Sequence, residues 1–326
     1  MRALTLLAIC AAPLSLTGLT AKKFGFEDAT GSVVAAQAPA FKIVAVGHRG
    51  AKGLAPENTI ASANAAIAAG ARLIEADVRF TKDGVPVIMH DRTVNRTTNG
   101  RGRVKDLTLA EIKALDAGSW MGQRFTAERV PTLREMLRNA KGRAMIDIDF
   151  KDGPPNAGDL IKAALDAEGY RDAQLVTIFV RPNRYGQLAS LARDYHLRPH
   201  YQSDGQTRQY GASVSVKVMG LRRRAFNFHR AAVIRENNLL LFSNIMGADD
   251  GVRGIKDSIN ADARFIMTDH LEILVPYLRA RGLLETCLLD HEFECIDEPG
   301  GPDRRNNRVR VAGRGGIQNP EIDSAP

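Results

Sequence analysis

Short runs of apolar and β-branched residues alternate along the chain with stretches of helical periodicity. From residue 41 onward, eight such runs have the length and composition of strands: residues 43–46, 73–78, 85–89, 143–150, 175–180, 197–201, 239–243 and 264–267. About eight strands that alternate with helices are typical of a (β/α)8 barrel of the TIM type. We therefore predict an α/β fold with a single barrel domain over residues 41–284.

Capping signals mark the ends of several expected helices. The Ala-rich stretch 59–69 stops at Gly70, a residue that readily takes the left-handed conformation after a helix. Thr108 and Thr132 each precede a glutamate by three residues, which is the spacing of a capping box. Further helices are expected over residues 159–168, 184–195 and 271–281, the last one kinked at Pro276. A doubly wound sheet is the competing architecture, but no Gly-x-Gly-x-x-Gly motif follows the first strand.

Two regions do not follow the alternation. Residues 203–237 are irregular, although 212–218 alternates like a strand, and three consecutive arginines begin at Arg222. This region is not assigned to an element. Residues 285–326 are rich in glycine, proline, asparagine, arginine and aspartate, which predicts a polar, basic tail without a packed core.

The N-terminus, residues 1–36, has the pattern of an export signal and a linker. A single arginine precedes the almost wholly apolar or small stretch 3–19, and a pair of lysines ends it. Cleavage after Ala21 or Ala36 is compatible with this pattern. An uncleaved anchor is the alternative, although the stretch is short for a bilayer span. We expect an exported protein, periplasmic or secreted.

Charge and cysteine content add to this picture. The net charge of the chain is +8, and its excess is concentrated in the arginines at 222–224 and in the tail. Basic runs can bind nucleic acid, but no such module is recognisable and only 6% of residues are aromatic, so we expect no nucleic-acid partner.

Cys287 and Cys295 would remain after cleavage, either as a small disulfide loop or as unconnected thiols. The sequence leaves the oligomeric state open.

The first expected strand ends in a polar sequence. Residues 43–46 are apolar, and Gly-His-Arg-Gly follows at once. A strand that stops there delivers the imidazole of His48 and the guanidinium of Arg49 to one edge of the sheet, where they suit a phosphate or another anion. A surface turn with two polar residues is the alternative on this stretch alone.

The next strand carries two carboxylates. Glu75 and Asp77 are two positions apart, so both side chains project from the same face. Two acids inside a barrel repel each other and are costly to desolvate, unless a divalent cation such as Mg²⁺ or Ca²⁺ binds them. Asp83-Gly84 is a strong turn signal, and a two-residue hairpin around it would set Asp77 directly opposite His90. Two exposed acids on an edge strand are the alternative.

A later strand repeats this arrangement with a lysine. Asp147, Asp149 and Lys151 alternate with apolar residues and therefore share one face. Inside a barrel they need mutual neutralisation or a ligand. A surface strand would also explain them, but the residues between them are too apolar for that to fit easily.

Several motifs occur in order over residues 41–281, and together they are highly specific. They are His48-Arg49-Gly50, Pro56-Glu57-Asn58-Thr59, Glu75-x-Asp77-Val78, Thr81-x-Asp83-Gly84, Val87-Ile88-x-His90-Asp91, Asp106-x-Thr108, Leu115-Asp116-Ala117-Gly118-x-Trp120, Val130-Pro131-Thr132-Leu133-x-Glu135 and Thr268-Asp269. With them the chain resembles the glycerophosphodiester phosphodiesterase family, in the phosphatidylinositol-phospholipase-C-like superfamily. The resemblance implies a TIM-type barrel, one divalent cation, Mg²⁺ or Ca²⁺, and hydrolysis of a small-molecule glycerophosphodiester to glycerol phosphate and an alcohol.

The resemblance also implies roles for individual residues. By motif position these are acid–base catalysis by His48 and His90, metal binding by Glu75, Asp77 and Asp149, and phosphate binding by Arg49 and Lys151. Supporting contacts are expected from Glu57, Asn58, Asp91 and Asp269. Asp147 should lie deeper in the barrel and not touch the metal. The sequence does not say which histidine is the acid and which the base.

Three positions depart from the family pattern. Asp149-x-Lys151 stands where the family usually has Glu-x-Lys, and an aspartate there is similar to the sphingomyelinase D and lysophospholipase D branch, which lacks the His-Arg-Gly motif. Residues 270–271 replace a segment that usually has a proline, and 242–244 replace a common Trp-Thr pair. The shorter Asp149 arm favours Mg²⁺ over Ca²⁺, because Mg²⁺ usually keeps several waters.

These departures leave two alternatives to a glycerophosphodiesterase. One is phospholipase D-type hydrolysis of a lysophospholipid or sphingolipid, with peripheral membrane contact through the basic clusters. The other is a non-catalytic binding protein on the same barrel, which the presence of both histidines and a full set of acids disfavours.

Overall fold

The computed structural model describes residues 25–27, 33–35, 41–170, 175–213, 215–247, 250–290, 293 and 295–296. Two short strands, β1 (Gly25–Glu27) and β2 (Val33–Ala35), pair antiparallel ahead of the main domain. The apolar stretch of the expected export signal, 3–19, and the tail beyond residue 296 lie outside the described residues.

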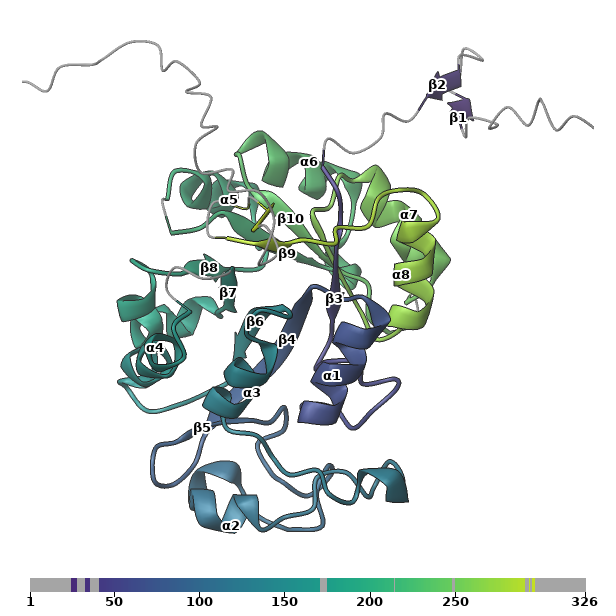
Figure 1. The fold of residues 1–326 in the computed structure, drawn as a ribbon. Coiled ribbons are helices and arrows are strands. Elements are labelled where there is room, and N and C mark those ends of the chain that lie inside the picture. The colour runs from purple at the N-terminus through teal and green to yellow at the C-terminus, as the bar shows by residue number, and fades with distance from the viewer. Residues whose placement is uncertain are drawn as a thin grey trace, which may run out of the picture.

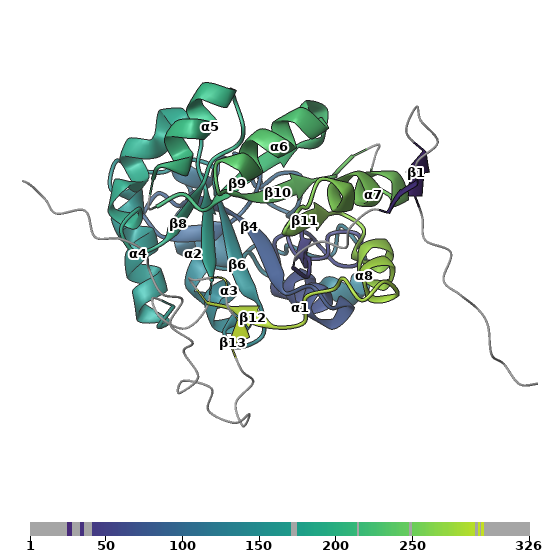
Figure 2. The same ribbon diagram turned by 90° about the horizontal axis from the view of Figure 1, so that it is seen from above.

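Eight parallel strands form a nearly closed barrel, which confirms the predicted TIM-type fold (Figures 1 and 2). In spatial order they are β8 (His196–Arg198), β7 (Val176–Phe179), β6 (Met145–Phe150), β4 (Leu73–Phe80), β3 (Val44–Gly47), β11 (Phe265–Thr268), β10 (Leu240–Asn244) and β9 (Val218–Arg222). A parallel bridge between His200 and Gly220 joins the ends of this order beside β8 and β9.

Helices surround the strands, as the view from above shows (Figure 2). They are α1 (Ile60–Ala69), α3 (Leu133–Ala140), α4 (Ala157–Ala167), α5 (Asp204–Gly211), α6 (Phe228–Glu236), α7 (Val252–Asn260) and α8 (Leu271–Arg279), with the 3₁₀ helices η3 (Pro182–Leu191) and η4 (Arg223–Ala225). Gly70 ends α1 at φ 102°, and both Thr108 and Thr132 form capping boxes, all as predicted. The α-helix expected over residues 184–195 is instead the 3₁₀ helix η3. Within the described residues, no helix combines the length and apolarity needed to cross a membrane.

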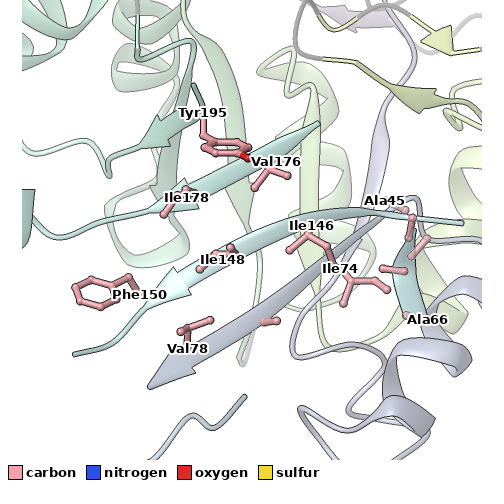
Figure 3. Close-up of a cluster of buried hydrophobic side chains, with 14 of the residues drawn as sticks. Ala45, Ala66, Ile74, Val78, Ile146, Ile148, Phe150, Val176, Ile178 and Tyr195 are labelled. Atoms are coloured by element: carbon pink, nitrogen blue, oxygen red, sulfur yellow. The ribbon is translucent and has the colours of Figure 1, made fainter. Parts of the chain in front are cut away.

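Strand alternation divides the core into two layers. Side chains such as Ile74, Ile146 and Ile178 pack outward under the helices (Figure 3). Leu73, Phe242 and other inward-facing side chains fill the barrel interior toward the amino-terminal ends of the strands. Because side chains alternate along a strand, the residues that share the face of Leu73 on β4 also point inward. Glu75 and Asp77 are among them, as expected.

The prediction that residues 85–89 form a barrel strand is wrong. β5 (Pro86–Ile88) pairs antiparallel with the end of β4 and lies outside the barrel. The eighth barrel strand is β9, which comes from the region left unassigned. Its short apolar pattern is interrupted by Gly220 and ends at Arg222, so it does not resemble an ordinary buried strand.

The predicted register of the hairpin is also wrong, by one residue. Asp77 lies opposite Met89, whose backbone N–H donates to the Asp77 carbonyl at 2.8 Å, and not opposite His90. The loop contains three residues, 82–84, with Gly84 at φ 79°. A three-residue loop that ends in a left-handed glycine is a common hairpin form, and it shifts the pairing relative to a two-residue turn.

A long insertion follows β5 and lies below the barrel in Figure 1. It contains η1 (Val104–Asp106), α2 (Leu109–Lys113) and η2 (Gln123–Phe125), and it has its own apolar cluster around Val94 and Ile112. After α8, β12 (Leu288–Leu289) pairs antiparallel with β13 (Cys295–Ile296). Cys287 and Cys295 form a disulfide, so the first of the two alternatives for these cysteines holds.

Candidate active site

The expected site residues converge at the carboxyl ends of the barrel strands. There they line a cavity of about 330 Å³ whose walls include His48, Arg49, Glu75, His90, Asp149 and Lys151. In a TIM barrel this end carries the active site in essentially every characterised enzyme, because the loops that follow the strands meet there.

His48 follows β3, and its ring is held in one orientation. Its Nδ1 atom lies 2.6 Å from Oδ1 of Asp269. Burial alone would raise the pKa of Asp269, but the hydrogen bond with His48 and the contact with Lys52 lower it to about 2. An ionised carboxylate only accepts hydrogen bonds, so Nδ1 of His48 donates and its Nε2 is left as the acceptor.

The free nitrogen of His48 faces the acidic residues. Its Nε2 atom lies 3.9 Å from Oε2 of Glu75. Burial lowers the pKa of His48, and this outweighs the opposite effect of the hydrogen bond to Asp269. The ring is therefore neutral near pH 7 and able to take a proton at Nε2.

The ring of His90, like that of His48, is held by a carboxylate. Its Nδ1 atom lies 2.7 Å from Oδ1 of Asp91. Hydrogen bonds from Arg96 and His90 lower the pKa of Asp91 to about 2, so this carboxylate is also an acceptor. The guanidinium of Arg79 donates to the backbone carbonyl of His90 through Nε at 3.0 Å and Nη2 at 2.7 Å. These contacts fix both the backbone and the ring of His90.

Three carboxylates form a candidate cation site. Glu75, Asp77 and Asp149 each offer an oxygen within 4.8 Å of the others. Burial raises the pKa of Glu75 and of Asp149, and the charge of Asp77 adds to this effect. The buried Oδ1 atom of Asp149 has no hydrogen-bond partner. Hard, crowded carboxylate oxygens with an unsatisfied acceptor fit a divalent cation such as Mg²⁺ or Ca²⁺.

Lys151 partly neutralises these acids. Its Nζ atom lies 2.7 Å from Oδ1 of Asp77 and 2.5 Å from Oδ2 of Asp149. Burial alone would lower the pKa of Lys151, but the charges of the two aspartates raise it. The lysine is therefore a permanent positive charge next to the carboxylates.

The loop after β3 is tied to β4 through two strained residues. Arg49 and Asn58 have φ angles of 53° and 60°, which cost non-glycine residues about 1–3 kcal/mol each. The Arg49 N–H donates to Oε2 of Glu75 at 2.8 Å, and Nδ2 of Asn58 donates to Oδ2 of Asp77 at 2.7 Å. The same bonds that hold the strained backbone also orient the carboxylates.

Asp147, two positions before Asp149, belongs to a different environment. It is fully buried and forms a two-pronged ion pair with Arg198, with Nε at 2.9 Å from Oδ1 and Nη2 at 2.5 Å from Oδ2. Thr177 also donates to it at 2.6 Å. Its carboxylate oxygens are therefore bound to Arg198 and Thr177, deeper in the barrel than the cavity. The sequence predicted this deeper position for Asp147.

Some contributors have no signal in the sequence. Lys52 lies 2.8 Å from Oδ2 of Asp269. Arg96 connects Glu57, at 2.7 Å, with Asp91, at 2.7 Å. Neither residue stands at a spacing that links it to its partners, because both contacts depend on how the loops fold over the barrel mouth.

Comparisons with known proteins agree with this geometry. The model of the glycerophosphoryl diester phosphodiesterase family matches residues 48–163. A glycerophosphodiester phosphodiesterase of Caldanaerobacter subterraneus subsp. tengcongensis is 34% identical over 255 residues, which are 74% of this chain and 100% of the relative. The chain belongs to the glycerophosphodiester phosphodiesterase family.

Other known proteins match over part of the chain or in fold. The Bacillus subtilis protein YhdW is 49% identical over 113 residues, so the match spans 46% of that relative. The crystal structure of the Agrobacterium tumefaciens glycerophosphodiester phosphodiesterase superposes with a TM-score of 0.63 at 29% identity, over 72% of this chain and 99% of that one. A phosphodiesterase from Oleispira antarctica, solved with the product sn-glycerol-3-phosphate, has the same fold, with a TM-score of 0.66 at 23% identity over 73% of this chain and 97% of that one.

Proposed function

We propose that this glycerophosphodiester phosphodiesterase hydrolyses small glycerophosphodiesters to glycerol phosphate and an alcohol, with His48 and His90 as its acid–base pair. The observation that carries the proposal is that both rings line one cavity, each with Nδ1 on an ionised carboxylate. Two oriented imidazoles suit the two proton transfers that such a hydrolysis needs.

We assign the general base to His48. It is the buried, neutral ring, and its accepting Nε2 atom faces the acidic cluster. It would deprotonate the attacking group, either water or the glycerol 2-hydroxyl. In the second case a cyclic phosphate would form first, and water would then open it to give glycerol phosphate. His90 then protonates the leaving oxygen of the alcohol. Each proton transfer typically contributes about 10²–10⁴-fold to the rate.

The remaining charged groups act on the phosphate. Glu75, Asp77 and Asp149 would hold one divalent cation, which supplies positive charge for the developing negative charge on the phosphoryl oxygens. Arg49 and Lys151 add fixed positive charges at the same place, because both line the cavity and contact Asp77. We favour Mg²⁺, since the short Asp149 arm leaves room for water ligands.

The reaction can be tested by the bond that breaks. Glycerophosphocholine incubated with the enzyme and Mg²⁺ should give sn-glycerol 3-phosphate and choline. Phosphorus NMR would monitor the conversion and identify the phosphorus-containing product. Glycerol and phosphocholine as products would place the cleavage on the other side of the phosphorus. Absence of any turnover with Mg²⁺, Ca²⁺ or Mn²⁺ would contradict the proposal.

A larger lipid substrate is the second candidate. Five large apolar side chains are notably exposed among the described residues: Leu54, Trp120, Phe228, Val252 and Ile273. Exposed apolar side chains on a protein with a basic cavity suit contact with an anionic lipid surface. Comparing kcat/KM for glycerophosphocholine and lysophosphatidylcholine under identical conditions separates the two. A preference for the lysolipid would favour phospholipase D-type activity.

Export remains part of the proposal. Its support is the apolar stretch 3–19 together with the Cys287–Cys295 disulfide, because disulfides persist mainly in oxidising compartments. The products of a periplasmic or secreted enzyme would be released outside the cytoplasm.

A further inference from the structure

Half of the cavity is lined by arginines that the reaction does not use. Arg181 follows β7, Arg198 ends β8, and Arg222 ends β9. Each stands at an inward-facing strand position or its continuation, and all three line the cavity together with Arg224. These three adjacent strands are on the side of the barrel away from His48 on β3.

We propose that this half of the cavity binds a second phosphate group, carried by the alcohol part of the substrate. The proposal rests on the phosphodiesterase function above and adds a substrate class to it: glycerophosphodiesters with two phosphorus centres. We call Arg181, Arg198, Arg222 and Arg224 the arginine wall.

The base of the arginine wall has an unsatisfied donor that points to an anionic ligand. Arg198 is 1% exposed and uses two nitrogens on Asp147, but its buried Nη1 atom has no hydrogen-bond partner. Buried polar atoms are normally paired, so a free N–H donor beside a cavity marks a place for a ligand that accepts hydrogen bonds.

The outer members of the wall are not neutralised by neighbours. Among the described residues, Arg181, Arg222 and Arg224 form no ion pair, in contrast to Arg223, which contacts Asp257 at 3.2 Å. Burial lowers the pKa of His200, and the charges of Arg198, Arg222 and Arg181 lower it further. His200 is therefore neutral, and the wall presents only positive charge to the cavity.

Charge balance shows that a simple diester does not need this wall. The carboxylates of Glu75, Asp77 and Asp149 outweigh Arg49 and Lys151 by one negative charge. A bound divalent cation would turn this into one positive charge, which equals the single charge of a phosphodiester. The wall adds three unpaired positive charges, and a phosphate monoester carries about −1.5 to −2 charges at pH 7.

The shape of the wall also fits phosphate. Guanidinium groups bind phosphate oxygens in pairs of parallel hydrogen bonds, and they do so better than lysine does. Gly220 on β9 leaves the room this requires, since a Cβ there would lie 2.9 Å from Nη1 of Arg198 and 2.8 Å from Nδ1 of His200. The glycine lets Arg198 reach across the strand into the cavity.

A matched pair of substrates tests the proposal. Glycerophosphoglycerol and glycerophosphoglycerol phosphate differ only in the second phosphate. In wild type, kcat/KM should be about tenfold or more higher for the second substrate, as expected for charge-assisted hydrogen bonds. In an Arg181→Gln, Arg222→Gln double variant this ratio should fall by about tenfold. Arg143→Gln, at the opposite end of β6, removes an exposed charge and should leave the ratio unchanged.

Two outcomes would overturn the proposal. One is a wild-type ratio near one. The other is a double variant in which kcat/KM falls equally for both substrates, because that is the result of general electrostatic steering and not of a specific subsite.

Failure of the proposed reaction would be recognised separately. If neither substrate is hydrolysed, calorimetric binding of glycerophosphoglycerol phosphate to the chelator-treated protein still tests the wall. Binding about tenfold weaker in the double variant than in wild type would support the subsite, and equal binding would overturn it.

Discussion

The Nδ1 atom of His48 lies 2.6 Å from Oδ1 of Asp269, although 221 residues separate the two in the sequence. The contact exists because β3 and β11, the first and last parallel strands of the barrel along the chain, are hydrogen-bonded neighbours. Closure of the barrel therefore completes the pair that orients the proposed general base.

Replacing Asp269 with asparagine should shift the pH profile of the enzyme. The hydrogen bond and charge of Asp269 raise the pKa of His48 against the effect of burial, so their loss should lower that pKa further. Since the base acts in its neutral form, the acidic limb of kcat/KM should move to lower pH. The rate should also fall by roughly 10–100-fold, because the ring loses its fixed orientation.

The matched control is Glu272→Gln, in the first turn of α8, three residues after Asp269. Glu272 contacts the exposed ring of His270 at 2.8 Å and not that of His48. Its profile should equal that of wild type. An acidic limb that does not move in Asp269→Asn would contradict the assignment of His48 as the base.

His48→Ala and His90→Ala should each remove most of the turnover and leave the fold intact. Neither ring belongs to the apolar core clusters, and both line the cavity. Because the two residues act as a unit, the double variant should be little worse than either single one. Circular dichroism checks the fold. Activity near wild type in either single variant would exclude that histidine from the mechanism.

Asp149→Asn and Asp147→Asn should separate metal binding from stability. Asp149→Asn should weaken binding of Mg²⁺ in a calorimetric titration of the chelator-treated enzyme. Asp147→Asn should leave metal binding close to wild type but destabilise the fold by about 3–5 kcal/mol, because it leaves Arg198 as an uncompensated buried charge. Urea unfolding measures the second effect. If Asp147→Asn loses metal binding and Asp149→Asn does not, the assignment of Asp149 as the metal ligand is wrong.

Export should depend on the apolar stretch 3–19. Fractionation of a Gram-negative host should recover the protein outside the cytoplasm and shortened at its N-terminus. Leu7→Arg interrupts the apolar stretch and should hold the protein in the cytoplasm, whereas Thr5→Ser should not. Full-length wild-type protein in the cytoplasm would contradict export.

Much of the barrel was predictable because its signals are local. Thr132 and Glu135 form a capping box within one helical turn, and Leu73, Glu75 and Asp77 share a strand face through simple alternation. The order of the motifs along the chain identified the family. The family pattern in turn indicated which histidines and acidic residues to expect in the site.

The rest depends on contacts that sequence spacing does not encode. β9 was missed because Gly220 interrupts its apolar pattern, and that glycine is explained by the side chains of Arg198 and His200, which come close to it from β8 and the residues after it. The pairing of Arg198 with Asp147 spans 51 residues and gives no local signal. The hairpin register failed for a smaller reason, since its loop contains three residues and not two.

The central claim is that a divalent cation at Glu75, Asp77 and Asp149 works with the two histidines. The most direct test measures release of sn-glycerol 3-phosphate from glycerophosphocholine by enzyme treated with EDTA, before and after addition of Mg²⁺ or Ca²⁺. The treated enzyme should be inactive, and one equivalent of bound cation should restore turnover, with Mg²⁺ the better of the two. Full turnover in excess EDTA would contradict the account.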